Sequence, residues 1–271
     1  MNFKNIDLAV KSFDNINLHY KKDLVDNPKA VILISHGLAE HCKRYDYVTK
    51  KLNSFKYSVY RYDHRGHGLS DGRRGHLNDY NTLFKDMNTM VDLIKSENKN
   101  IPIFIIGHGI GGHSLVGFGS NYLNKVDGMI FSSPLICDYN SLTDIKCIEN
   151  DPFMLIPNSN SHELTHDFDT MDSYENDSLI LNSVTLGIYN ELNKSCKNMI
   201  NILSNFNYPC LILHSLSDSI VSYEDSNFLY ENISSEDKEV KLLSGLYHKL
   251  LDEIVKDEIL IEISKWINIR L

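Results

Sequence analysis

Apolar residues along this chain follow two alternating patterns. Continuous apolar runs, several of them rich in β-branched side chains, predict strands buried on both faces at residues 30–35, 58–63, 102–107, 128–133, 210–214 and 240–243. The segments between these runs predict helices at residues 45–55, 83–96, 110–122, 223–233 and 250–269. Strands that alternate with helices imply an α/β fold with a mostly parallel sheet covered on both faces.

Two regions depart from this alternation. Residues 8–13 and 16–20 are short alternating runs around the turn-forming pair Asp14-Asn15, and they predict a hairpin. Residues 136–202 are rich in Asn, Ser and Asp, with one apolar island at Phe153-Met154-Leu155-Ile156-Pro157. A long insertion between core strands is more often a functional lid than an idle loop. We therefore expect a core made of residues 1–135 and 203–271 and a cap made of residues 136–202.

Charge and cysteine content narrow the possible partners and compartment. The net charge of −9 and the lack of a basic run argue against a nucleic-acid partner. Five cysteines without C-x-x-C spacing fit reduced thiols better than a disulfide framework. No apolar run is long enough for a signal peptide or a transmembrane helix. We expect a cytoplasmic protein, with any contact to a membrane made by an apolar patch.

The segment with the most chemical information follows the apolar run at 102–107. Gly107-His108-Gly109-Ile110-Gly111 places two glycines around a tight turn between a buried strand and a helix. A G-x-S-x-G sequence in this context presents a serine hydroxyl as a nucleophile. Here both outer glycines are present, but position 109 is glycine and carries no hydroxyl.

Three further features follow other predicted strands. The turn at His36-Gly37-Leu38 can aim the Leu38 backbone N–H at a developing oxyanion, and the Ile110 N–H is the matching donor at the turn around Gly109. Asp218 follows the strand at 210–214, and His248 follows the last strand. Active sites in such sheets collect beyond the carboxyl ends of the strands. The order of nucleophile position, acid and histidine therefore predicts a Ser-His-Asp-type site.

The same residues carry a resemblance to a known family. The motifs are His36-Gly37-x-x-Glu40-His41, the glycine- and histidine-rich stretch 63–76, the turn 107–112, Leu164-Thr165-His166-Asp167, Tyr174-x-Asn176-Asp177, Asp218 and Gly245-x-x-His248. Together they resemble the monoacylglycerol lipase and lysophospholipase branch of the α/β-hydrolase superfamily, with its serine aminopeptidase S33-type domain, over nearly the whole chain. Two positions differ from the family pattern, because residue 215 is serine instead of glycine and residue 109 is glycine instead of the nucleophilic serine.

The resemblance implies a role for each of these positions. Asp218 would be the triad acid, His248 the general base, Leu38 and Ile110 the oxyanion donors, and residues 136–202 a cap over an acyl-chain pocket. The implied ligand is a lipid-like ester such as a monoacylglycerol or a lysophospholipid, with no metal and no organic cofactor. The residues that we expect to contact substrate are His36, Gly37, His108, Phe153 and Met154. The apolar island that contains Phe153 would either pack inside the cap or form a lip that faces a membrane.

Glycine at position 109 changes the expected activity more than the expected fold. Without a side chain to acylate, the chain cannot form an acyl-enzyme, so we expect a nearly inactive hydrolase. Glycine adopts the strained turn conformation at no steric cost, so we expect stability to be equal to or greater than that of a serine version. Two explanations are open. The glycine is native, and the chain is a pseudoenzyme that binds a lipid or a partner, or the glycine was introduced to silence an enzyme.

Two other segments compete for the role of active site. Ser114 could replace the missing nucleophile, but it lies in the following helix without the exposure of the turn. His162-Glu163-Leu164-Thr165-His166 is a literal H-E-x-x-H sequence, which on a helix binds zinc with the glutamate as base. Turn-forming residues flank it, and the third ligand would have to be a residue such as Glu191, so we expect no zinc protease.

Overall fold

The structure is a computed structural model of the chain, and it describes residues 5–141, 143, 151–158 and 161–271. Its main sheet has eight strands in the order β1-β2-β4-β3-β5-β6-β9-β10. The strands β3 to β6, β9 and β10 are parallel, whereas β1 and β2 add an antiparallel hairpin at one edge. These strands are β1 (Asn5–Lys11), β2 (Asn17–Asp23), β3 (Ala30–Ser35), β4 (Tyr57–Tyr62), β5 (Ile103–His108), β6 (Gly128–Ser132), β9 (Cys210–Ser215) and β10 (Lys238–Leu243).

Helices cover the sheet on both faces, as the sequence pattern predicts. One face packs against α2 (Asn81–Glu97), α3 (Ile110–Asn121) and α6 (Tyr223–Asn232). The other face packs against α1 (Asp46–Ser54) and α7 (Lys256–Asn268). Every residue of the central strands β3, β4, β5, β6 and β9 is buried, which explains why they read as continuous apolar runs. The prediction of a mostly parallel, doubly covered sheet is confirmed.

One predicted helix is wrong in its extent. The segment 250–269 does not form a single helix, because a short 3₁₀ helix, η4 (Leu250–Asp252), ends before α7 begins at Lys256. Glu253 lies between them in extended backbone, fully buried, and its side chain accepts hydrogen bonds from the Tyr247 N–H and from His166. These hydrogen bonds keep Glu253 out of a helix and connect it to the segment that follows β10 and to His166.

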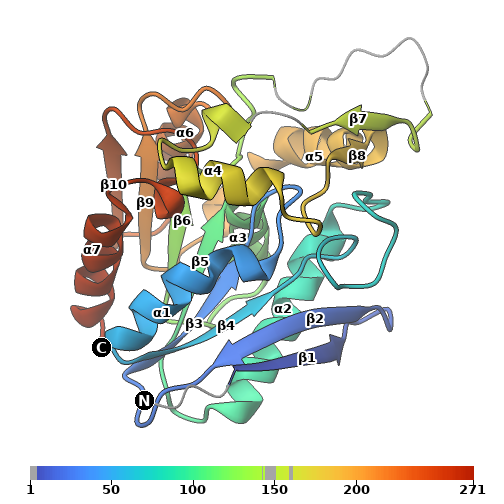
Figure 1. Cartoon of the computed structure of the whole chain (residues 1–271). Coiled ribbons are helices and arrows are strands. Elements are labelled where there is room, and N and C mark those ends of the chain that lie inside the picture. The colour runs from blue at the N-terminus through green and yellow to red at the C-terminus, as the bar shows by residue number, and fades with distance from the viewer. Residues whose placement is uncertain (1–4, 142, 144–150, 159–160) are drawn as a thin grey trace.

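Most of the elements between β6 and β9 lie at the carboxyl end of the sheet (Figure 1). At that end lie β7 (Leu155–Pro157), η2 (Ser161–Glu163), α4 (Phe168–Glu175), β8 (Ser183–Thr185) and the start of α5 (Leu186–Met199). The last element before β9, η3 (Leu203–Asn205), instead packs in the core cluster beside α3. A separate apolar cluster joins α5 and β8 to the core, with Val184, Ile188 and Leu192 packed near Ile110 and Leu135. No helix among the described residues is long and apolar enough to cross a membrane.

Candidate active site

The turn between β5 and α3 has the strained backbone expected at this position. Gly109 has φ 54° and ψ −115°, in the left-handed half of φ that side-chain-bearing residues rarely adopt. Its N–H donates to the Ser132 carbonyl at 3.2 Å, and its carbonyl accepts from the His113 N–H at 3.0 Å and the Leu135 N–H at 3.2 Å. These backbone hydrogen bonds fix the turn without any help from a side chain at position 109.

The outer glycines of the turn are required by close packing. A Cβ on Gly111 would lie 2.1 Å from the Ser35 carbonyl oxygen, and a Cβ on Gly107 would lie 2.6 Å from the Gly111 carbonyl oxygen. The strand β3 and the start of α3 therefore approach each other at backbone distance. This approach brings the turn after β3 next to the turn at Gly109.

The structure brings Asp218 and His248 together from two loops. Asp218 follows β9, His248 follows β10, and His248 Nδ1 donates to Asp218 Oδ2 at 2.7 Å. The other carboxylate oxygen accepts from the Ile220 and Val221 N–H groups at 2.9 and 3.0 Å. Burial would raise the pKa of Asp218, but electrostatic attraction to His248 and the hydrogen bonds from His214 and His248 outweigh it and hold the pKa well below its usual value.

A second histidine contacts the same carboxylate. His214 Nε2 lies 3.1 Å from Asp218 Oδ2, and its Nδ1 lies 2.6 Å from the Ser226 hydroxyl oxygen. His214 is fully buried. The sequence pattern alone predicted no role for His214, although its position at the end of β9 is a signal for one.

The Gly109 corner faces the free edge of His248. A Cβ on Gly109 would lie 3.7 Å from His248 Nε2 and 3.8 Å from the Gly37 Cα, and no other atom of the described residues lies within 4 Å, chain neighbours of Gly109 apart. Since α3 begins at Ile110, the Ile110 N–H belongs to the first turn, whose N–H groups lack partners within the helix. The Asp218 carboxylate, the His248 imidazole, the Gly109 turn and the Ile110 N–H thus lie at one place.

A cavity of about 240 Å³ opens at this place. Its apolar lining comes from both the core and the segment between β6 and β9, and consists of Leu38, Ile110, Leu135, Ile156, Pro157, Leu164, Leu192, Ile220 and Val221. Its polar and aromatic lining consists of Glu40, His108, Asn158, Tyr174, Tyr189 and His248, beside Gly109. A mostly apolar cavity with a few convergent polar groups is typical of a site for an amphipathic ligand.

Not all residues predicted to contact substrate line this cavity. Of the five residues predicted to contact substrate, His108 lines it, and so do the predicted oxyanion donors Leu38 and Ile110. Gly37 is not in the lining, and His36 lies fully buried and hydrogen-bonded to the Gly37 carbonyl and the His64 N–H. Phe153 instead stacks on the Arg73 guanidinium, 3.8 Å from the ring centroid, and on His76. Met154 is not in the lining either, and the residues that replace the pair are Ile156, Pro157 and Asn158.

A buried polar cluster beside His248 was missed by the sequence analysis. Lys249 Nζ forms ion pairs with Glu40 at 3.1 Å and with Asp252 at 2.6 Å, and all three groups are largely shielded from solvent. The His108 ring lies 4.6 Å from the His248 ring, between centroids, and 3.7 Å from Glu40. Burial, followed by the neighbouring His248, lowers the pKa of His108 to about 3, so His108 is neutral at pH 7.

The competing segments have other functions in the fold. Ser114 is fully buried and donates to the Ile110 carbonyl within α3. The 3₁₀ helix η2 ends at Glu163, so His162 and His166 do not share a helix face. His166 instead pairs with Glu253 at 3.0 Å and stacks on Tyr247. The geometry that zinc binding by H-E-x-x-H requires is therefore not formed there.

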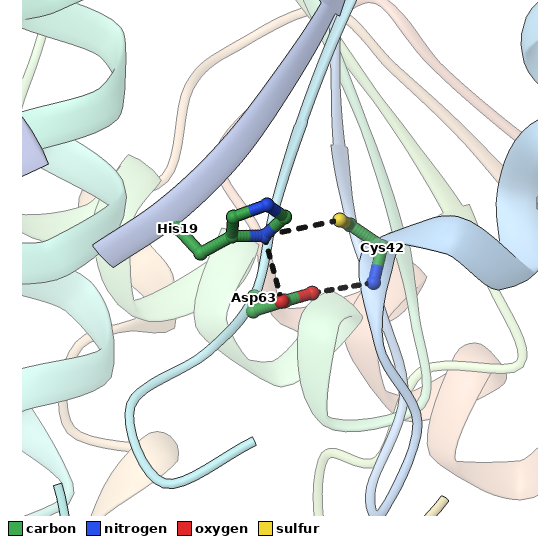
Figure 2. Close-up of side chains that lie close together, drawn as sticks. All are labelled: His19, Cys42 and Asp63. Atoms are coloured by element: carbon green, nitrogen blue, oxygen red, sulfur yellow. Dashed lines mark hydrogen bonds and ion pairs between the residues drawn. The ribbon is translucent and has the colours of Figure 1, made fainter. Parts of the chain in front are cut away.

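One other group of side chains has a donor set that suits a metal ion. His19, Cys42 and Asp63 are buried together, with their ligand atoms within 4.8 Å of one another (Figure 2). Both Asp63 oxygens already accept hydrogen bonds, from the Cys42 N–H, the Leu69 N–H and His19. Burial, followed by the Asp63 charge, raises the pKa of the Cys42 thiol, which disfavours the thiolate that a metal needs. These hydrogen bonds connect β2, the residue that follows β4, and η1 (Cys42–Tyr45).

Known proteins resemble this chain over most of its length. Residues 26–254 match the family described as Serine aminopeptidase, S33. The chain is 26% identical over 248 residues to the monoacylglycerol lipase of Mycolicibacterium smegmatis, with 89% of each chain covered. It is 29% identical over 256 residues to the monoglyceride lipase of Mus musculus, with 90% of this chain and 84% of that protein covered. A soluble variant of the Saccharomyces cerevisiae monoglyceride lipase, solved with a substrate analog, has a TM-score of 0.83 at 22% identity, covering 97% of this chain and 94% of that chain.

Proposed function

The chain belongs to the serine aminopeptidase S33 family of α/β-hydrolases, and we propose that it keeps the ligand-binding and acid–base parts of a monoacylglycerol lipase-type ester hydrolase without the nucleophile. The α/β-hydrolase fold and the monoglyceride lipase-type scaffold are established by the match to the family and to these relatives. The finer proposal concerns what each residue does and what glycine at position 109 removes.

The observation that carries the proposal is the position of His248 between Asp218 and Gly109. Asp218 accepts from Nδ1 and so leaves Nε2 as the basic nitrogen, which is directed at the position of a side chain on residue 109. In a version with serine there, His248 would take the hydroxyl proton as the oxygen attacks an ester carbonyl. The proposed N–H donors, Leu38 and Ile110, would stabilise the oxyanion that forms.

Glycine at position 109 removes the atom that this reaction needs. Loss of the nucleophile from a serine hydrolase triad lowers kcat by about 10⁶ and leaves roughly 10³–10⁴ over water. The cavity and the Asp218–His248 pair do not depend on that atom. We therefore propose that the chain binds a lipid-like ester and forms no acyl-enzyme.

We further propose that residues 136–202 are a cap over the acyl chain. The described part of this segment contributes Ile156, Tyr189 and Leu192 to the cavity lining. Its exposed large apolar side chains include Phe153 (44%), Leu155 (63%) and Phe168 (81%). These residues support a peripheral contact with a lipid surface through the cap. The free thiols of Cys42, Cys137, Cys196 and Cys210 support a reducing compartment such as the cytoplasm, and Cys147 lies outside the described residues.

A second candidate function is a lipid-binding module without turnover. The observation that favours it is the combination of an open, mostly apolar cavity with a turn that has no reactive side chain. Both candidates predict binding of a monoacylglycerol, and they differ in whether the acid–base pair is still competent.

The experiment that tests the proposed function introduces the hydroxyl. We expect Gly109→Ser to hydrolyse a monoacylglycerol at a rate several orders of magnitude above the parent chain, with a lysophospholipid as the second substrate. Gly109→Ser combined with His248→Ala is the matched control, and it should lower activity to the parent level or below it. A folded Gly109→Ser protein that binds monoacylglycerol but does not cleave it would refute the hydrolase scaffold and favour the binding module.

A further inference from the structure

We propose that the bare corner at Gly109 admits a water molecule that His248 activates for direct attack on a bound ester. The chain would then be a slow hydrolase that works in a single displacement, with no covalent intermediate. This inference rests on the proposed function, because it uses the same cavity, base and oxyanion donors. It concerns what the glycine makes possible, whereas the proposed function concerns what the glycine removes.

Space for the water comes from the missing side chain. Beyond its chain neighbours, a Cβ on Gly109 would have two atoms of the described residues within 4 Å, His248 Nε2 at 3.7 Å and the Gly37 Cα at 3.8 Å. The volume in front of it belongs to the cavity, since Gly109 and His248 both line the cavity. A water molecule in this volume lies within hydrogen-bonding reach of Nε2, which needs a separation of about 3 Å.

Glycine differs in this respect from alanine, the usual replacement for a nucleophile. A water oxygen must stay at van der Waals distance from the nearest carbon of residue 109. In alanine that carbon is the Cβ, which points toward Nε2. In glycine it is the Cα, one bond further back. The water can therefore approach the position of a serine hydroxyl more closely at a glycine than at an alanine.

His248 is prepared to act as the base. Its Nδ1 is engaged by Asp218 Oδ2 at 2.7 Å, and Asp218 is held by His214, Ile220 and Val221. Among the described residues, no hydrogen bond to His248 Nε2 is formed. The Nε2 lone pair is thus available for a proton from water, and the Asp218 carboxylate stabilises the imidazolium that results.

The reaction balances without a co-reactant. The water oxygen forms a bond to the ester carbonyl carbon while one water proton moves to His248 Nε2. The carbonyl oxygen becomes an oxyanion opposite the Leu38 and Ile110 N–H groups. When this intermediate collapses, the bond from carbon to the alcohol oxygen breaks and the alcohol takes the proton from Nε2. The products are a carboxylic acid and an alcohol, and His248 is neutral again.

The test compares residue 109 as glycine, alanine and serine, with a monoacylglycerol as substrate. We expect the parent chain to cleave it slowly but measurably, and Gly109→Ala and His248→Ala each to lower that rate at least tenfold. We also expect the parent activity to resist a fluorophosphonate, because no serine is acylated. This resistance separates the activity from that of any contaminating serine hydrolase.

Two results would overturn the inference. A Gly109→Ala rate equal to that of the parent chain would show that the space at residue 109 does not matter, and a His248→Ala rate equal to the parent rate would show that no base acts. Gly109→Ser distinguishes this failure from failure of the proposed function. If Gly109→Ser is active while the parent rate matches that of His248→Ala, the proposed function is supported and the water mechanism is refuted. If a folded Gly109→Ser is also inactive, the proposed function falls.

Discussion

The two sides of the proposed active site are held in place by different means. On the acid–base side, side-chain hydrogen bonds fix Asp218, which accepts from His248 and His214 as well as from two backbone N–H groups. On the nucleophile side, the Gly109 turn is fixed by backbone hydrogen bonds and by the close approach of β3 to Gly111. Because nothing in the turn depends on a side chain at position 109, the hydroxyl can be absent while the geometry of the site persists.

The largest expected effect comes from breaking the side-chain network. In the Gly109→Ser background, Asp218→Asn should lower kcat by about 10⁴, because the amide no longer favours the productive imidazole tautomer. His214→Gln, which keeps Asp218 charged, should have a much smaller effect. Steady-state kinetics with a monoacylglycerol measure both. Equal losses for the two variants would mean that Asp218 acts only as a structural group.

The next largest effect is expected on stability, when the close backbone approach around the Gly109 turn is disrupted. Gly111→Ala should lower the free energy of unfolding by about 3 kcal/mol or more, since the new Cβ would lie 2.1 Å from a backbone oxygen that cannot move freely. Gly245→Ala is the control, because Gly245 has positive φ but an added Cβ would meet no non-neighbouring atom of the described residues within 4 Å. It should cost about 1 kcal/mol. Urea unfolding compares them, and equal costs would argue against the close approach.

A smaller effect is expected when a side chain returns to position 109. Gly109→Ser should lower the free energy of unfolding by about 1–3 kcal/mol, the usual cost of a strained backbone conformation, although the added Cβ has room. Gly109→Ala should cost a similar amount, since the strain comes from the Cβ and not from the hydroxyl. A stabilised Gly109→Ser protein would show that the turn is not strained.

The two sides also respond differently to pH. Burial lowers the pKa of His108, next to the Gly109 turn, to about 3 in the folded chain. The unfolded chain therefore binds a proton at His108 at a higher pH than the folded chain does. The contribution of neutral His108 to the free energy of unfolding is complete above its unfolded pKa, near 6.5. It is lost as pH falls toward its folded pKa. Asp218, whose pKa is lowered, loses its contribution only below about pH 4.

We therefore expect stability to fall as pH drops below about 6.5, and His108→Asn to make that slope shallower. The change should approach 1.4 kcal/mol per pH unit, the value for one proton. Urea unfolding at pH 7.5, 6.5 and 5.5 measures the slope for both proteins. Identical slopes would mean that His108 is not buried in neutral form.

The sequence predicted those parts of the site that depend on strand order. Asp218 and His248 each follow a core strand, and the carboxyl ends of parallel strands meet at one edge, so their proximity follows from the pattern alone. The fully buried runs at β3, β5 and β9 identified the sheet for the same reason.

The parts that the sequence did not predict depend on which way side chains point. The apolar island 153–157 could not show that Ile156 and Pro157 line the cavity while Phe153 covers Arg73. Helix α5 (Leu186–Met199) lies in a stretch whose polar composition masked its periodicity. Nothing in the sequence indicated that Lys249 is buried, because its ion pair with Glu40 joins two loops that are far apart in sequence.

The central claim is that this chain contains a complete ester-cleaving site except for one oxygen atom. Covalent labelling of Gly109→Ser with a fluorophosphonate tests it most directly, because the reaction needs the turn, the base and the oxyanion donors at once. We predict stoichiometric labelling at position 109, none in the parent chain, and none when His248→Ala is added. A folded Gly109→Ser protein that remains unlabelled would contradict the claim.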